Sequence, residues 1–272
     1  MHFAQWQQFH GPLVGFAVAL GLALAGRFLR VALLAAAAGA AGVVAGWYAV
    51  IGRQWAVSPQ PSVDELTALA AIALLIGLLC TWLGPGRQAW IGILLAALAA
   101  GWFLSGGPRN LAAFRASWPN GLGVAIAVLL FGRALTVGAL DPLRLALAAL
   151  TLAVALHIAG TPPIWTQLAL VPGLAALAMC TLPPMPGLAA LPVVVDIAAL
   201  GCLVMMAHGR LPRLGFAPVD AAALSPLLAI WLQPHTAERL RRIGRAAPLG
   251  GCLLAGAIAV GCVWLVRLYL NR

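Results

Sequence analysis

Apolar stretches long enough to cross a lipid bilayer, roughly 17–25 residues each, recur along this chain and limit its fold more than any other feature. Apolar residues make up 63% of the 272 residues, and charged residues make up 8%. A soluble domain has about a quarter of its residues charged. A membrane β-barrel would alternate apolar and polar residues, whereas the run VALLAAAAGAAGVVAG does not. The sequence therefore predicts an all-α, polytopic transmembrane helix bundle that forms one integral membrane domain over residues 1–272.

The number of spans depends on the arginines. Nine apolar runs are apparent, at about 10–26, 31–51, 66–84, 88–106, 120–140, 143–160, 166–182, 187–207 and 248–270. A tenth, at 214–233, is interrupted by Asp220 and two prolines. The positive-inside rule places Arg27, Arg30 and the dense arginine cluster at 239–245 in the cytoplasm, which requires an even number of crossings between them. We therefore expect ten spans with both termini outside; nine spans remain the alternative, because the total arginine count favours that topology.

All sixteen basic residues are arginine, and the formal net charge is +10. The arginines are scattered at the ends of apolar runs and form no continuous basic groove, which favours a role in orienting helices over nucleic-acid binding. The charge pattern of residues 235–247 predicts a basic amphipathic segment in the cytoplasm, which would pack against anionic lipid headgroups. The arginine usage is typical of a GC-rich genome, and we expect a multi-pass protein of the bacterial inner membrane with the lipid bilayer as its first partner.

Two patterns predict how the helices sit in the bilayer. Tryptophans near run ends are typical of an interfacial belt. They are Trp47, Trp82, Trp90, Trp102, Trp118, Trp165, Trp231 and Trp264. The second run is rich in small residues and ends in Gly42-x-x-x-Gly46, which predicts a central, tightly packed helix. This motif does not separate dimerisation from packing within one chain.

Asp196 is the most informative charged residue, because it lies near the middle of the apolar run 187–207, whose late part belongs to the stretch 191–210. A carboxylate at that depth is unfavourable by roughly 2.5–3.5 kcal/mol and normally faces a partner or a water-filled cavity. Arg133 lies about three residues, or roughly 4 Å along a helix axis, from the midpoint of its own run. We expect the two side chains to pair, either as a structural contact or as a substrate- or ion-binding site.

Interior prolines favour the second interpretation. Pro172, Pro192 and Pro226 fall inside the runs at 166–182, 187–207 and 214–233, and Pro192 lies one turn before Asp196. A proline removes a backbone hydrogen bond, and transporters place substrate and ion sites at such broken helices. The first five runs are expected to lack a comparable interior proline, which argues against a simple inverted repeat.

Other chemistry has weaker support. His157 and His208 are expected on one side of the membrane, where they could hold a metal or a haem. The five cysteines fall singly inside apolar runs, and no hydrolase, metalloprotease or phosphate-loop motif occurs, so an enzyme is disfavoured and no cofactor is expected.

Three functions therefore remain. The first is a transporter or permease for a small solute or ion, with Asp196, Arg133 and Pro192 at its site. The second is a non-catalytic subunit or assembly factor of a larger membrane complex, which would add other membrane subunits as partners. The third is an intramembrane redox or haem protein that uses His157 and His208.

Overall fold

A computed structural model describes residues 2–55, 61–80, 85–104, 110–136, 142–181, 217–240 and 247–270, and these residues form helices joined by short turns, with no strand among them. The helices are α1 (His2–Phe28), α2 (Ala32–Trp55), α3 (Pro61–Cys80), α4 (Pro85–Leu104), α5 (Leu111–Thr136), α6 (Pro142–Ile158), α7 (Pro163–Cys180), α9 (Pro218–Leu240) and α10 (Ala247–Leu270). The all-helical prediction is therefore confirmed for this part of the chain.

Local sequence explains where several helices begin. Proline is the first residue of α3, α4, α6, α7 and α9, a position where its missing N–H leaves no bond unmade. At α9 the carboxylate of Asp220 also accepts a hydrogen bond from the backbone N–H of Ala217 (2.8 Å), which holds the first turn closed. At α5 the side chain of Asn110 accepts one from the N–H of Ala113 (2.7 Å).

Four helices are long and apolar enough to cross a membrane, judged by length and composition: Phe9–Phe28, Ala32–Gly52, Pro163–Cys180 and Pro248–Leu270. Three shorter apolar helices are Leu66–Leu79, Trp90–Trp102 and Pro142–Ile158. This pattern suggests a membrane protein. The ten-span count stays a prediction, because the run at 187–207 lies outside the described residues and α9 is not among these apolar helices.

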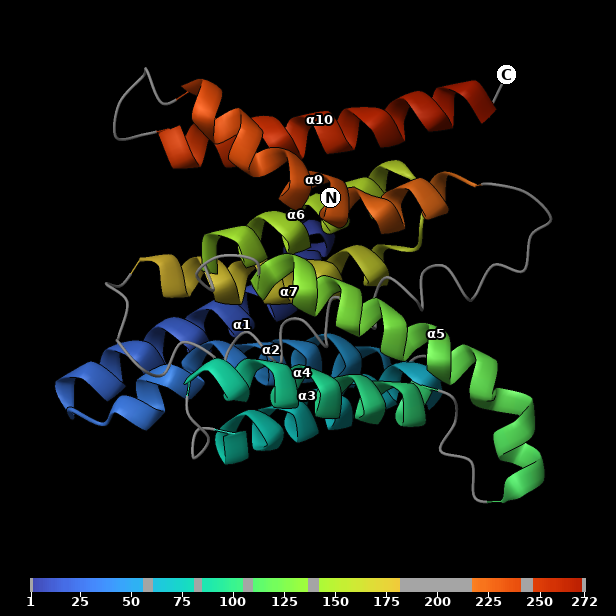
Figure 1. Cartoon of the computed structure of the whole chain (residues 1–272). Coiled ribbons are helices and arrows are strands. Elements are labelled where there is room, and N and C mark those ends of the chain that lie inside the picture. Colours follow the sequence, from blue (N-terminus) through green and yellow to red (C-terminus); the bar gives the residue numbers. More distant parts are fainter. Residues whose placement is uncertain are drawn as a thin grey trace.

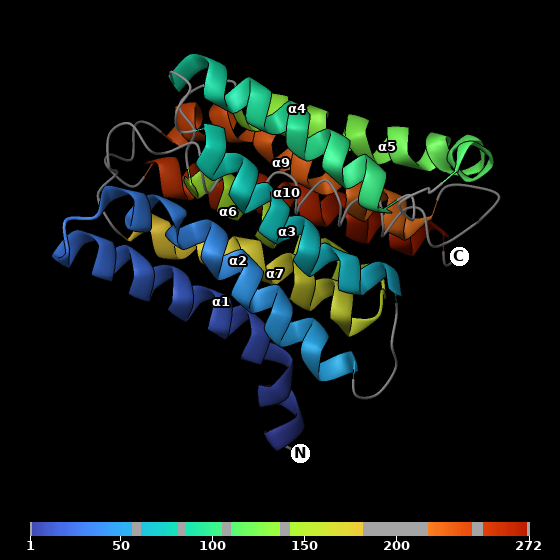
Figure 2. The same cartoon turned by 90° about the horizontal axis from the view of Figure 1, so that it is seen from below.

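The hairpin of α6 and α7 lies at the centre of the described bundle (Figures 1 and 2). The hairpin of α1 and α2 packs against α7, and the hairpin of α9 and α10 packs against α6. Helix α3 joins this core through α2, and α4 and α5 follow it at the flank. The buried residues are mainly alanine, leucine and valine, so the helices approach closely over short side chains.

Contacts along the helices fix their directions. Val171 of α7 lies against both Gly15 of α1 and Gly46 of α2, while α1 and α2 are antiparallel. At the far side of the hairpin, Arg267 near the end of α10 donates to the carbonyl of Ile158 at the end of α6, so these two helices are parallel. Figure 2 shows that α1 begins and α10 ends towards the same end of the bundle.

Glycines permit the closest helix contact. A Cβ atom on Gly42 would lie 2.6 Å from the carbonyl oxygen of Gly15, and one on Gly46 would lie 3.1 Å from that of Gly11. The expected tight packing of the second run is therefore confirmed, with more than half of its apolar window buried. The Gly42-x-x-x-Gly46 motif is used for packing within one chain, because α1 and α7 pack against these two glycines.

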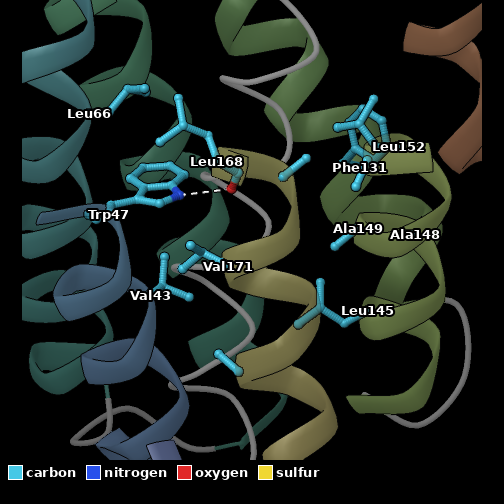
Figure 3. Packing of buried hydrophobic residues seen from close by; sticks show 14 of the residues in the cluster. Val43, Trp47, Leu66, Phe131, Leu145, Ala148, Ala149, Leu152, Leu168 and Val171 are labelled. Carbon is cyan, nitrogen blue, oxygen red and sulfur yellow. Dashed lines mark hydrogen bonds between the residues drawn. The ribbon is translucent and has the colours of Figure 1, made fainter. Parts of the chain in front are cut away.

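Trp47 departs from the predicted interfacial belt. Its side chain is fully buried, and its Nε1 donates a hydrogen bond to the backbone carbonyl of Leu168 in α7 (3.0 Å; Figure 3). Leu168 is four residues before Pro172, whose ring nitrogen has no hydrogen to donate to that carbonyl. Trp47 therefore supplies the hydrogen bond that Pro172 removes.

Of the other predicted belt residues, Trp165 is also buried, so the prediction is wrong for two of them. Five others are about half or more exposed on the outside of the bundle, as a belt requires. They are Trp90, Trp102, Trp118, Trp231 and Trp264. Trp82 lies outside the described residues.

The expected absence of interior prolines from the first five runs is wrong. Pro12 lies inside α1, and Pro119 lies inside α5. Pro12 lies within the first run itself, at 10–26, whereas Pro119 precedes the fifth run and is included because α5 begins earlier, at Leu111. Interior prolines are thus spread over both halves of the chain and give no argument about a repeat.

We expect Gly42→Ala to destabilise the protein by about 1–3 kcal/mol, the usual effect of overpacking, because the added methyl group meets backbone. Gly52→Ala is the matched control on the same helix, since no atom lies within 4 Å of its added Cβ. Thermal unfolding in detergent measures both. Equal behaviour of the two variants would contradict the assigned packing.

We also expect Trp47→Phe to cost about 1–3 kcal/mol, because it leaves the buried carbonyl of Leu168 without the indole donor. In a Pro172→Ala background the new backbone N–H can bond that carbonyl, and the same Trp47→Phe change should then cost less. Unfolding of the four proteins of this double-mutant cycle tests the account, and an equal cost in both backgrounds would refute it.

Candidate functional site

Arg133 does not lie near the middle of its helix. It is in the last turn of α5, and its side chain is exposed. The sequence run was taken as 120–140, whereas α5 covers Leu111–Thr136, so the helix centre shifts away from Arg133. Asp196 and Pro192 lie outside the described residues. Their proximity to Arg133 therefore stays a prediction, and any such pair would lie towards a helix end.

Five arginines with described side chains gather at one end of the bundle, which we call the arginine-rich end. Here α1 and α5 end, α6 begins and α9 ends. The residues are Arg27, Arg30, Arg133, Arg144 and Arg239. Only Arg115 and Arg267 of the described arginine side chains belong to the opposite end. This segregation is the one that the positive-inside rule expects of a membrane protein.

A polar contact inside the bundle lies close to the arginine-rich end. The Nε of Arg144, in the first turn of α6, donates a hydrogen bond to Oε1 of Gln233 in α9 (3.1 Å). Gln233 is 7% exposed, so this bond is made among packed helices. Gln233 was not predicted as a site residue, because the candidate residues were chosen by charge and Gln233 is neutral.

Thr236 extends the polar contact to α10. Its hydroxyl lies 2.7 Å from the carbonyl oxygen of Gly251 and 3.0 Å from that of Gln233. A Cβ atom on Gly251 would lie 2.7 Å from the backbone of Ala237, so glycine lets α9 and α10 touch at this point. Residues 235–240, the first part of the predicted amphipathic segment, are the continuous end of α9.

Helix α9 places three uncharged polar side chains inward. Ser225, Gln233 and Thr236 are buried, whereas Leu224 and Trp231 are 57% and 64% exposed. Such a helix is suited to a lipid surround with a polar interior. Its buried Pro226 cannot donate to the carbonyl of Ala222, and the hydroxyl of Ser225 donates to that carbonyl instead (2.7 Å).

The opposite end of α6 has a different arrangement. Arg267 donates to the carbonyl of Ile158, and the hydroxyl of Thr161 donates to that of Leu156 (2.8 Å), so carbonyls at the end of α6 have partners. A cation is also favourable at a helix C-terminus. His157 lies in this last turn with an exposed side chain, and His208 lies outside the described residues. Within the ranges that the structure describes, no group of three potential metal ligands occurs.

No family model, curated protein or solved structure matches this chain. Among the described residues, the contact of Arg144 with Gln233 of the proline-containing helix α9 is the strongest candidate site.

We expect the side chains of Arg144 and Gln233 to be energetically coupled. In a double-mutant cycle of Arg144→Met and Gln233→Met, the coupling should be about 0.6 kcal/mol and at most about 1.7 kcal/mol, the range of hydrogen bonds between membrane helices. Unfolding in detergent measures it. Arg115→Met is the control, because Arg115 is exposed at the opposite end and should not couple to Gln233.

Proposed function

We propose that the chain is a multi-pass transporter for a small solute or ion in the bacterial inner membrane, with its arginine-rich end in the cytoplasm. The bilayer is its surround, and the site is formed between α9, α6 and the eighth apolar run. The observation that carries the proposal is the inward polar face of α9, a helix with two interior prolines, Pro226 and Pro234, whose Gln233 accepts a hydrogen bond from Arg144 of α6.

Proline-containing helices support a transporter because they free backbone groups near buried polar side chains. In α9 one freed carbonyl is already bonded by Ser225, which shows how the polar face compensates for Pro226. Polar side chains of this kind, enclosed by apolar helices, are where transporters bind substrates and coupling ions.

Asp196 completes the proposed site. Residues 182–216 connect the arginine-rich end, where α7 stops, with the opposite end, where α9 starts. In the proposal this segment crosses the membrane as the eighth span, bent at Pro192, and brings Asp196 to the interior. In this arrangement Arg133 lies at the cytoplasmic end of the proposed transport path.

A non-catalytic subunit or assembly factor is the alternative. It would use the apolar outer surface for partner subunits and would keep Asp196 sealed. The glycine motif that best suits helix association is occupied by α1 and α7 within this chain, which favours the transporter. The redox alternative requires His157 and His208 to approach each other, and purified protein would then show a Soret band.

We expect a cysteine at position 196 to react with a charged, water-soluble thiol reagent in membranes. The test uses Asp196→Cys in a variant whose five native cysteines are replaced. Ile258→Cys is the control, because Ile258 is near the middle of α10 and 41% exposed on the outside of the bundle. The reagent needs water and a thiolate, so reaction at 196 and none at 258 supports a hydrated path.

Lack of reaction at 196 would favour the subunit. Asp196→Asn and Arg133→Gln then separate function from stability. For a transporter, Asp196→Asn should abolish flux into proteoliposomes while the unfolding temperature in detergent changes little. If both variants lower stability and flux survives, the charges are structural.

A further inference from the structure

The outer face of α9 changes from apolar to basic along its length. Leu224, Trp231, His235 and Arg239 are all exposed and follow one another at intervals of seven, four and four residues, which places them on one side of the helix. We call these four residues the α9 stripe. The ring of Trp231 meets that of His235 edge-on, with centroids 5.4 Å apart and an angle of 62° between the planes.

This order of side chains matches that of a phospholipid in the cytoplasmic leaflet. Leu224 offers an apolar surface to an acyl chain, and Trp231 offers a ring suited to the boundary between chain and headgroup. His235 and Arg239 offer hydrogen-bond donors to a phosphate. Arg239 lies eight residues beyond Trp231, roughly 12 Å along the axis, which is the scale of that boundary.

The charge at this end favours an anionic headgroup. Arg239 belongs to the arginine-rich end, and three further arginines follow it within six residues of sequence. Glu238 is exposed beside it and is the opposing charge on this part of α9. Each arginine near an anionic membrane surface raises the binding affinity about fivefold. The arginines here outnumber Glu238, so the net interaction with an anionic headgroup is attractive.

The geometry points to a binding site for an anionic phospholipid on the α9 stripe, with Trp231 at the acyl–headgroup boundary and Arg239 at the phosphate. The site rests on the insertion of α9 in a membrane, and it is independent of the proposed transport. If the lipid test contradicts this site, the thiol-accessibility test at position 196 still decides the proposed transport separately.

The test measures which lipid touches Trp231. Full-length protein is reconstituted into vesicles of equal parts phosphatidylglycerol and phosphatidylcholine, with brominated chains on one lipid or on the other. Bromine quenches neighbouring tryptophans, and the signal of wild type minus that of Trp231→Phe isolates Trp231 from the other tryptophans. We expect brominated phosphatidylglycerol to quench Trp231 several-fold more effectively than brominated phosphatidylcholine.

Variants identify the residues responsible. Arg239→Ala should lower the preference for phosphatidylglycerol roughly fivefold, and Glu238→Gln should raise it. Arg115→Ala, at the opposite end, should leave it unchanged. Soluble glycerol phosphate should not reduce quenching by brominated phosphatidylglycerol, because it lacks the chains that contact Leu224 and Trp231.

Three results would overturn the site. Equal quenching by both lipids would show ordinary annular contact, and an equal effect of Arg115→Ala and Arg239→Ala would show diffuse attraction. Absence of quenching of Trp231 by either lipid would show that another protein or segment covers the stripe. Competition by glycerol phosphate would show a site for a free anion.

Discussion

A backbone carbonyl buried away from water must receive a hydrogen bond, and this requirement explains the two most specific contacts of the bundle. Pro172 and Pro226 each deprive the carbonyl four residues earlier of its usual donor. The indole of Trp47 bonds the first of these carbonyls, and the hydroxyl of Ser225 bonds the second. Since the first contact joins α2 to α7, a local break in one helix becomes a link between two hairpins.

The sequence predicted the class of structure because it depends on length and composition. Apolar runs must be helical in lipid, and the described ones are. Helix ends were less predictable, since polar residues and Pro119 are carried into α5 beyond the apolar run. Trp47 was misplaced for a related reason. Its position near a run end resembles that of the exposed tryptophans, and its partner Leu168 lies 121 residues further along the chain.

The candidate site was predicted only in part, because its members differ in how visible they are in a sequence. Arg133 was judged by its distance from the middle of an apolar run, and a shift of the helix bounds moved it to the last turn of α5. Arg144 lies at the start of α6, and its partner Gln233 carries no charge, so the sequence did not predict their contact. Asp196 lies outside the described residues, so its place rests on sequence alone.

Helix α9 unites these observations, because its two faces meet opposite requirements. A helix in lipid gains nothing from hiding apolar side chains in a bundle, since lipid is equally apolar. Its polar groups therefore determine which face turns inward, and in α9 that face carries Ser225, Gln233 and Thr236. The outward face is then free to match the bilayer, from Leu224 to Arg239. Because both faces belong to one helix, the proposed lipid on the outer face and the bond of Gln233 to Arg144 on the inner face would hold the same part of α9.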